Sequence, residues 1–376
     1  MRLLHTRDMS SGQIRTGNIS TASPAAAASA TEIAAMSRAV ELAARGAGTV
    51  LPNPVVGCVL LDQHGAVIGE GWHQQAGGAH AEVNALNQAG ERARGATAVV
   101  TLEPCNHQGR TGPCSLALIN AGVARVVIAV LDPNPAAVGG VATLQKAGVE
   151  VVTGVQEKEA SDVNRVWLGV LATQRPYVSF KAGTTVDGRV AAVDGTSKWI
   201  TSPASRGDVH RLRSEVDTML VGVGTVLADD PMLTVRHPDG SLAMRQPLRV
   251  IADSLGQTPA SAKILGDEAP TWVATTADVG AGSDGRLSLP LLMAKLYGFG
   301  RRHVLLEGGP RLAAAMLDAG LMDEIIFYIA PLALGAGKNA IDGGSVNTLA
   351  QGHRLELRDV TTFDADVRLR YTVRRD

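Results

Sequence analysis

The sequence predicts an α/β protein made of two successive domains. The chain has 376 residues, which exceeds the usual size of one domain, so two hydrophobic cores are expected. Short apolar runs alternate with segments of helical spacing in both halves, as in sheets whose strands are joined by helices. A charged, mixed stretch separates the halves. We therefore divide the chain into a disordered tail, a first domain, a linker and a second domain, over residues 1–30, 31–155, 156–175 and 176–376.

The tail is rich in Ser, Thr, Ala and Gly and lacks the apolar core of a signal peptide. This composition predicts disorder. A transit peptide is the alternative, because the segment carries Arg2, Arg7 and Arg15 and few acids. Organised sequence begins near Thr31, so Met36 lies close to a possible functional start.

In the first domain, Ile33, Met36, Val40 and Ala43 recur at helical spacing, and Pro52-Asn53-Pro54 breaks the pattern. The remaining apolar runs and breakers extend the alternation to the end of the domain. We expect helices over 31–45, 80–90, from 113 and over 141–147, and strands over 55–61, 66–71, 98–102, 123–130 and 149–153.

The second domain begins at Gln174-Arg175-Pro176 and has the same alternation, followed by two alternating runs typical of antiparallel strands. Asp187-Gly188 predicts a turn, and Ser202 or Ser205 can cap a helix that reaches Arg213. We expect strands over 177–182, 219–223, 248–252, 271–274, 303–307, 324–330, 354–361 and 366–373, and a helix over 311–319.

Composition excludes several classes of function. The chain has 35 basic and 36 acidic residues and 3% aromatic residues, which argues against a nucleic-acid binder. No apolar stretch is long enough to span a membrane. The three cysteines are too few for a disulfide framework and fit a reducing compartment, so we expect a cytoplasmic protein.

One group of residues predicts chemistry by itself. His80-Ala81-Glu82 is followed by Pro104-Cys105 and Pro113-Cys114, the pattern of zinc-dependent deaminases. Zinc binds imidazole nitrogen and thiolate sulfur, and a catalytic site leaves one position to a water whose pKa the metal lowers. We therefore predict His80, Cys105 and Cys114 as zinc ligands and Glu82 as the proton shuttle.

A closed structural zinc site is the alternative, since His107 could supply a fourth ligand. The pairing of His80 with Glu82 and the Pro-Cys context favour catalysis. Eight residues separate Cys105 from Cys114, whereas nucleic-acid deaminases have two. This longer loop, with Gly109, Arg110 and Thr111, predicts a different substrate pocket.

Longer motifs resemble one family, the bifunctional deaminase–reductases of riboflavin biosynthesis. In the first half these motifs are Pro52-Asn53-Pro54-x-Val56-Gly57-Cys58, the His80 segment, and residues 101–114. In the second half they are residues 181–189, 197–201, 224–236 and 306–310. The resemblance runs from about residue 31 to the end. It implies a cytidine-deaminase-like α/β/α sandwich followed by a dihydrofolate-reductase-like α/β domain.

The family implies two consecutive reactions on a small phosphorylated pyrimidine. A hydrolase step removes the 2-amino group of a diamino-ribosylamino-pyrimidinone 5′-phosphate, and an oxidoreductase step then uses NADPH to reduce its ribosyl group to ribityl. The resemblance places substrate on Asn53, Ser197, Arg213, Leu233, Arg236 and Glu307, and adds Lys181 and Asp187 near it. It places NADPH on Gly183, Trp199, Thr225, Asp229, Ser254, Gly309, Pro310, Arg311, Leu312, Ala313, Ala314 and Ala315. A homo-oligomer is a further family expectation.

Several of these residues have a plain structural alternative. Asn53 could be a turn residue between prolines, Arg213 part of a solvated helix face, and Trp199 a core residue. Gly308 and Gly309 fit a phosphate-binding helix start or an ordinary strand-to-helix turn, and Asp187 a simple turn. Asn84 stands where the family often has a second histidine and would lie on the helix side of His80.

Two other functions stay open on sequence alone. The zinc motif also fits a nucleic-acid base deaminase with an accessory domain, which the charge, the few aromatic residues and the long cysteine loop oppose. Alternatively, the second half could be a binding module without activity. No Gly-x-Gly-x-x-Gly follows a strand, so a Rossmann site is not predicted.

Overall fold

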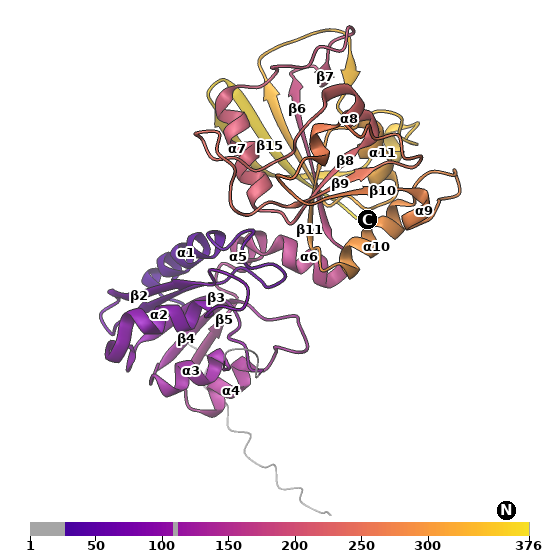
Figure 1. The fold of residues 1–376 in the computed structure, drawn as a ribbon. Coiled ribbons are helices and arrows are strands. Elements are labelled where there is room, and N and C mark those ends of the chain that lie inside the picture. The colour runs from indigo at the N-terminus through magenta and orange to yellow at the C-terminus, as the bar shows by residue number, and fades with distance from the viewer. Residues whose placement is uncertain (1–26, 108–111, 376) are drawn as a thin grey trace, which may run out of the picture.

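The computed structural model describes residues 27–107 and 112–375. Most of the predicted tail, and Gly109, Arg110 and Thr111 of the cysteine loop, lie outside these residues. The two predicted α/β domains are confirmed and lie at opposite ends of the molecule (Figure 1). No helix among the described residues is long and apolar enough to cross a membrane.

The first domain is a five-stranded sheet in the order β2-β1-β3-β4-β5, in which β1 runs antiparallel to its neighbours and β3, β4 and β5 run parallel. Its strands are β1 (Gly57–Leu61), β2 (Val67–Trp72), β3 (Thr97–Leu102), β4 (Arg125–Val130) and β5 (Glu150–Thr153). Its helices are α1 (Ala30–Ala44), α2 (Ala81–Ala89), α3 (Cys114–Asn120) and α4 (Gly140–Lys146), with a short 3₁₀ helix, η1 (Gly90–Ala93).

Alternate residues of each strand point to opposite faces and build two cores. Cys58 and Leu60 of β1 pack toward α2, α3 and α4, whereas Val59 and Leu61 pack toward α1. The domain is therefore the expected α/β/α sandwich. Gly71 brings α2 against β2, because a Cβ atom there would lie 2.3 Å from the Ala81 carbonyl oxygen.

Residues 156–175, predicted as a linker, form two helices, α5 (Glu157–Val163) and α6 (Arg165–Thr173). Ala160 of α5 is buried in the core beside α1. Between the helices, Asn164 bonds the Val55 nitrogen and oxygen through its side-chain amide, and Arg165 pairs with Glu324 of the second domain. The connection is thus a packed part of the fold (Figure 1).

The second domain contains an eight-stranded sheet in the order β10-β9-β8-β11-β6-β12-β15-β14. The first six of these strands are parallel, and the last two add antiparallel pairs, as their alternating sequences predicted. The strands are β6 (Tyr177–Thr185), β8 (Thr218–Gly222), β9 (Leu248–Ala252), β10 (Thr271–Ala274), β11 (His303–Glu307), β12 (Glu324–Ala330), β14 (Leu355–Phe363) and β15 (Asp366–Val373).

Helices cover both faces of this sheet. Residues of α10 and α11 pack on one face, and residues of α7 and α8 pack on the other. Their bounds are α7 (Pro203–Ser214), α8 (Val223–Asp229), α10 (Leu289–Gly298) and α11 (Pro310–Asp318), with the short α9 (Thr276–Val279) beside them. The smaller elements are the pair β7 (Arg189–Ala191) and β13 (Lys338–Asn339), and the 3₁₀ helices η2 (Lys263–Leu265) and η3 (Leu349–Gln351).

Candidate active sites of the two domains

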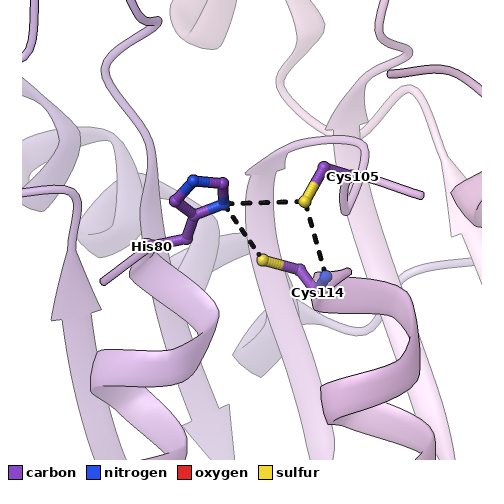
Figure 2. Close-up of side chains that lie close together, drawn as sticks. All are labelled: His80, Cys105 and Cys114. Carbon is purple, nitrogen blue, oxygen red and sulfur yellow. Dashed lines mark hydrogen bonds between the residues drawn. The ribbon is translucent and has the colours of Figure 1, made fainter. Parts of the chain in front are cut away.

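Two strand-to-helix junctions bring His80, Cys105 and Cys114 together. His80 is the N-cap residue of α2, Cys105 follows β3, and Cys114 is the first residue of α3. Figure 2 shows the imidazole facing both sulfur atoms. The His80 Nδ1 atom lies 3.3 Å from Cys114 Sγ and 3.6 Å from Cys105 Sγ.

These separations fit a zinc ion. With bonds of about 2.3 Å to sulfur and about 2.0 Å to nitrogen, a tetrahedral ion holds such donors roughly 3.5–3.8 Å apart. The three donor atoms lie within 4.8 Å of one another. One nitrogen and two sulfur donors are a typical zinc set, and three protein ligands leave a fourth position open.

His107 does not belong to this group. Among the described residues, the cluster of possible metal ligands contains His80, Cys105 and Cys114 alone, and His107 is exposed. The arrangement therefore favours the open, catalytic type of site over a closed site with four protein ligands. Cys58, the third cysteine, is fully buried in the core, where burial raises the pKa of its thiol well above the usual range.

Glu82 lies two residues beyond His80, in the first turn of α2, and is 3% exposed. Burial raises the pKa of its carboxyl to about 7. Beside it, a hydrogen bond with Cys114, aided by His80, lowers the pKa of the Cys105 thiol well below its usual range. The site thus favours a thiolate at Cys105 and a carboxyl group that can exchange protons at Glu82.

Glu103 was missed by the sequence analysis, although it lies two residues before Cys105. Its buried carboxylate accepts three backbone N–H bonds, from Asp132 at 3.2 Å, Gly139 at 3.2 Å and Val141 at 3.0 Å. The end of β3 is therefore tied to the loop before α4. These contacts fix the backbone from which Cys105 projects.

Asn53 and His73 form one wall beside the metal site. His73 Nδ1 lies 3.1 Å from the Ala79 carbonyl oxygen, so Nδ1 carries the proton and Nε2 accepts from the Asn53 amide at 3.4 Å. The His73 ring packs edge-on against His80 at 5.2 Å between centroids. Asn53 also closes a turn on Val50, so its structural and functional interpretations are compatible.

The Asn84 side chain bonds backbone carbonyl groups near the metal site. Its side-chain amide donates to the carbonyl oxygens of Trp72 and Ala79 at 2.8 and 3.3 Å. It therefore fastens the strand end of β2 and the residue before His80. This is a backbone-supporting role on the His80 side of the helix, as the helical spacing predicted.

A cavity of about 1070 Å³ opens at the carboxyl ends of the parallel strands in the second domain. That position is the usual ligand site of parallel α/β sheets. The cavity is large enough for a dinucleotide together with a small substrate. The residues that the sequence analysis assigned to ligands and that line it are Lys181, Gly183, Ser197, Trp199, Arg213, Thr225, Asp229, Ser254, Gly309, Pro310, Arg311, Leu312 and Ala315.

The other assigned residues lie behind the walls or outside the cavity. Ala313 and Ala314 are at most 1% exposed and face the core. Asp187 accepts hydrogen bonds from Thr185, Leu334 and Gly335, which lower the pKa of its carboxyl to about 2, with the Thr185 hydroxyl contributing most. Its carboxylate thus closes the turn between β6 and β7.

The start of α11 offers backbone donors to an anion. Gly308 and Gly309 have φ values of 73° and 71°, which side chains rarely adopt, and a Cβ atom on Gly308 would lie 2.9 Å from Thr225. The first turn of a helix has N–H groups without intrahelical partners. Together with the cavity volume, this fits the pyrophosphate of a dinucleotide.

Trp199 and Ser254 lie at other edges of the cavity. Trp199 is 70% exposed and stacks against the Arg206 guanidinium at 4.4 Å, so it is not a core residue. Ser254 accepts a hydrogen bond from the Leu287 nitrogen at 3.0 Å. That bond fixes the loop between α9 and α10 at the cavity wall.

Three charges meet at the floor of the cavity, where Lys181 and Arg213 line it and Glu307 lies just behind them. Arg213 binds both oxygens of the Glu307 carboxylate at 2.6 and 2.9 Å, and the Lys181 ammonium lies 3.7 Å from the same group. Burial alone would raise the pKa of Glu307, but Arg213 and Lys181 outweigh it and hold the pKa at about 2. Burial lowers the pKa of Lys181, partly offset by Glu307. Arg213 is therefore no solvated helix residue.

The loop over residues 230–236 is held from several sides. Leu233 is buried with a φ of 51°, a conformation that is uncommon for leucine. Arg213 donates to the Thr234 oxygen at 3.1 Å, and the Arg236 nitrogen donates to His210 Nδ1 at 3.2 Å. The Arg236 side chain bonds the Gly240 oxygen. Leu233, Arg236 and Glu307 thus lie next to the cavity wall without lining it in this structure.

Models of two protein families match the chain. The cytidine and deoxycytidylate deaminase zinc-binding region matches residues 29–130. The RibD C-terminal domain matches residues 176–369. The first match contains the three metal-site residues, and the second contains the cavity.

Relatives match across both domains. Riboflavin biosynthesis protein RibD of Mycobacterium tuberculosis is 44% identical over 90% of this chain and 97% of its own length. The Escherichia coli protein of that name is 42% identical over 88% and 96%.

Solved structures agree with this assignment. RibD of Acinetobacter baumannii is 41% identical, with a TM-score of 0.79 over 92% of this chain and 99% of that one. A deaminase/reductase of Thermotoga maritima is 33% identical, with a TM-score of 0.81 over 91% and 99%. The chain therefore belongs to the RibD family, the bifunctional zinc deaminases and reductases of riboflavin biosynthesis.

Proposed function

We propose that the chain converts one phosphorylated pyrimidine nucleotide in two steps. The first domain would remove an amino group from a diamino-ribosylamino-pyrimidinone 5′-phosphate by hydrolysis, and the second would reduce the ribosyl group of the product to ribityl. The observation that carries the proposal is the presence of both sites on one chain, the nitrogen–sulfur metal site and the dinucleotide-sized cavity. The Thermotoga maritima relative is named for activities on such nucleotides.

In the first site, His80, Cys105 and Cys114 would hold zinc. When bound, the ion acts as a Lewis acid and lowers the pKa of a water molecule. The Glu82 carboxylate would accept a proton from the attacking water and pass it to the departing amine. Its burial beside Cys114 keeps the carboxyl group out of bulk solvent during this transfer.

Asn53 would orient the pyrimidine at this site. Because His73 Nε2 engages its amide N–H, the Asn53 Oδ1 atom is left to accept from an amino group of the ring. The hydrogen bond also fixes which way the amide points. A turn residue without such a partner would rotate freely.

In the second site, the residues at the start of α11 would bind the phosphates of NADPH. Gly183, Trp199, Thr225, Asp229 and Ser254 would contact the rest of the cofactor, and Ala313 and Ala314 would support the first turn of α11 from the core side. The nucleotide would lie near the floor of the cavity, close to Lys181 in the middle of β6 and Glu307 at the end of β11. Ser197 and Arg213 line this cavity, and Leu233 and Arg236 shape the adjoining wall.

We further propose a cytoplasmic homo-oligomer that acts on a small molecule and not on nucleic acid. All three cysteines are free, and zinc ligation needs Cys105 and Cys114 in the reduced form that a cytoplasm maintains. The net charge of −1 gives no basic surplus for binding phosphate backbones. Light scattering of the purified protein measures the oligomeric state.

A coupled assay on the intact protein tests the proposal. With the pyrimidinone nucleotide alone, we expect ammonia release without reduction, and with NADPH added we expect oxidation of the cofactor after deamination. Deamination of tRNA or single-stranded DNA, but not of the nucleotide, would contradict the proposal and support a nucleic-acid deaminase. Deamination without NADPH binding or oxidation would make the second domain a binding module.

A further inference from the structure

One face of α7 forms a wall of the second cavity. Arg206, Val209, His210 and Arg213 lie three, four and seven positions apart and line the cavity together. Arg206 stacks on Trp199, and Arg213 binds Glu307. His210 lies between these two arginines on the same face, and the proposed function assigns it no role.

The protonation of His210 is fixed by its neighbour. The Arg236 backbone N–H donates to His210 Nδ1 at 3.2 Å, so Nδ1 is the acceptor. In a neutral imidazole the proton then lies on Nε2. Burial and the nearby Arg213 lower the pKa of the ring, which keeps it neutral near pH 7.

The Nε2–H group of His210 is a donor without a protein acceptor. Within residues 27–107 and 112–375, the hydrogen bond to Arg236 is the one that His210 makes with its ring. Its charged neighbours on the same wall already have partners: the Arg213 guanidinium binds Glu307, and Arg206 donates to the Thr201 oxygen. A half-buried donor of this kind is complementary to an oxygen atom of a ligand.

His210 lies near residues that the proposed function assigns to the nucleotide. It is three positions before Arg213 on the same face of α7, and Arg213 binds Glu307. His210 also holds the backbone of residue 236 in the 230–236 loop, which the proposed function places next to the nucleotide. Both observations place His210 beside residues that are assigned to the nucleotide.

We propose that His210 is a substrate-binding residue of the reductase site, whose Nε2–H donates to an oxygen of the phosphoribosyl part of the nucleotide. Its Nδ1 anchors the 230–236 loop at the same time. The two ring nitrogens thus have separate tasks. The inference rests on the proposed reductase function.

Two substitutions separate the two nitrogens. In His210→Asn, the amide oxygen can replace Nδ1 as the acceptor for Arg236, but the donor at Nε2 is lost. In His210→Gln, the amide N–H reaches the position of Nε2, but the Nδ1 acceptor is lost. His237→Asn, on an exposed histidine just beyond the loop, is the matched control.

Steady-state NADPH oxidation with the deaminated nucleotide gives the KM of each variant, and titration gives the Kd for NADPH. We expect His210→Asn to raise the nucleotide KM about tenfold, the loss of one neutral hydrogen bond. His210→Gln should raise it at most about threefold but lower the thermal unfolding midpoint. The NADPH Kd should change less than about twofold in both.

Other results would overturn the inference. A higher KM in His210→Gln but not in His210→Asn would mean that the ring acts only as a loop anchor. A higher Kd for NADPH with an unchanged nucleotide KM would mean that His210 Nε2–H donates to the cofactor and not to the nucleotide. If the unaltered protein reduces the nucleotide while His210→Asn keeps its KM, this inference fails alone; if the unaltered protein does not reduce it, the proposed function fails as well.

Discussion

The donors of the metal site lie within residues 80–114, whereas the walls of the second cavity come from residues 180–342. In the first site, each ligand occupies a strand-to-helix junction of one small sheet, and backbone hydrogen bonds such as those to Glu103 fix the loops. In the second, an ion-paired floor joins β6, α7 and β11 across 126 positions of sequence, from Lys181 to Glu307. A local site can be recognised from its motif, but a dispersed one depends on the whole domain being folded.

In the first site, Glu82→Gln should remove deamination while leaving the metal site intact. This change keeps the size of the side chain and the zinc ligands but removes the proton carrier, so deamination should fall about 10²–10⁴-fold. Zinc content by atomic absorption should stay near one ion per chain. Loss of zinc in this variant would instead make Glu82 a ligand.

In the second site, we expect a substitution in the ion-paired floor to lower the free energy of unfolding strongly. Arg213→Met leaves the buried Glu307 without its bidentate partner, and we expect a loss of about 3–5 kcal/mol in the free energy of unfolding of the second domain. Urea unfolding followed by far-UV circular dichroism measures it, while deamination reports the intact first domain. Arg211→Met, at an exposed arginine of the same helix whose partner Asp208 keeps its bond to Arg368, should cost less than about 1 kcal/mol. If both variants lost the same free energy of unfolding, the burial of the Arg213–Glu307 pair would not explain the effect.

Glu103→Gln tests whether the loop contacts, and not the ligands alone, shape the metal site. The amide keeps one acceptor oxygen, so we expect a loss of about 1–3 kcal/mol in stability and weaker zinc binding. Competition with a chelator measures the affinity, and the visible spectrum of the cobalt-substituted protein reports the ligand geometry. Glu91→Gln, an exposed glutamate of the same domain, should change neither. An unchanged cobalt spectrum would limit Glu103 to global stability.

The smallest expected effect is a pH dependence in the second domain. Burial lowers the pKa of His303 to about 3, from about 6.5 in the unfolded chain. The unfolded state therefore binds the extra proton, and stability falls as the pH drops below 6.5, by at most about 1.4 kcal/mol per pH unit. Below pH 4.5, Glu307 and Glu324, both with a pKa of about 2, add to the loss. His303→Gln should flatten urea-measured stability between pH 6.5 and 4.5; an unaltered slope would rule His303 out.

Sequence reasoning succeeded where structure is decided locally. The helix predicted over 31–45 forms over Ala30–Ala44 because its apolar spacing and its capping pair, Ser29 and Glu32, are all near neighbours. The three residues predicted as zinc ligands lie close together for the same reason, since one local motif carries them all. The final antiparallel strands were equally visible in their alternation.

What escaped the sequence depends on partners far along the chain. Nothing near Arg213 indicates that Glu307 will bind it, and nothing near His73 indicates that Asn53 will lie against it. The helix Leu289–Gly298 was missed because few polar residues interrupt its apolar ones, so no helical spacing is visible. The strand β7 was missed because its partner lies about 150 positions away in the sequence. The helix Glu157–Val163 was hidden by the charges of Glu157, Lys158 and Glu159, which lie on its exposed surface.

Asn164 and Arg165, two consecutive residues at the junction of α5 and α6, connect the two catalytic domains. The Asn164 side chain forms hydrogen bonds with the backbone of Val55, two positions after Asn53 in the first site. Arg165 forms an ion pair with Glu324 on β12, the strand next to β6 in the second domain. Any shift of this junction would therefore strain both catalytic units at once. The fused domains are not freely swinging modules, and substitutions accepted by one of them must be tolerated by the packing of the other.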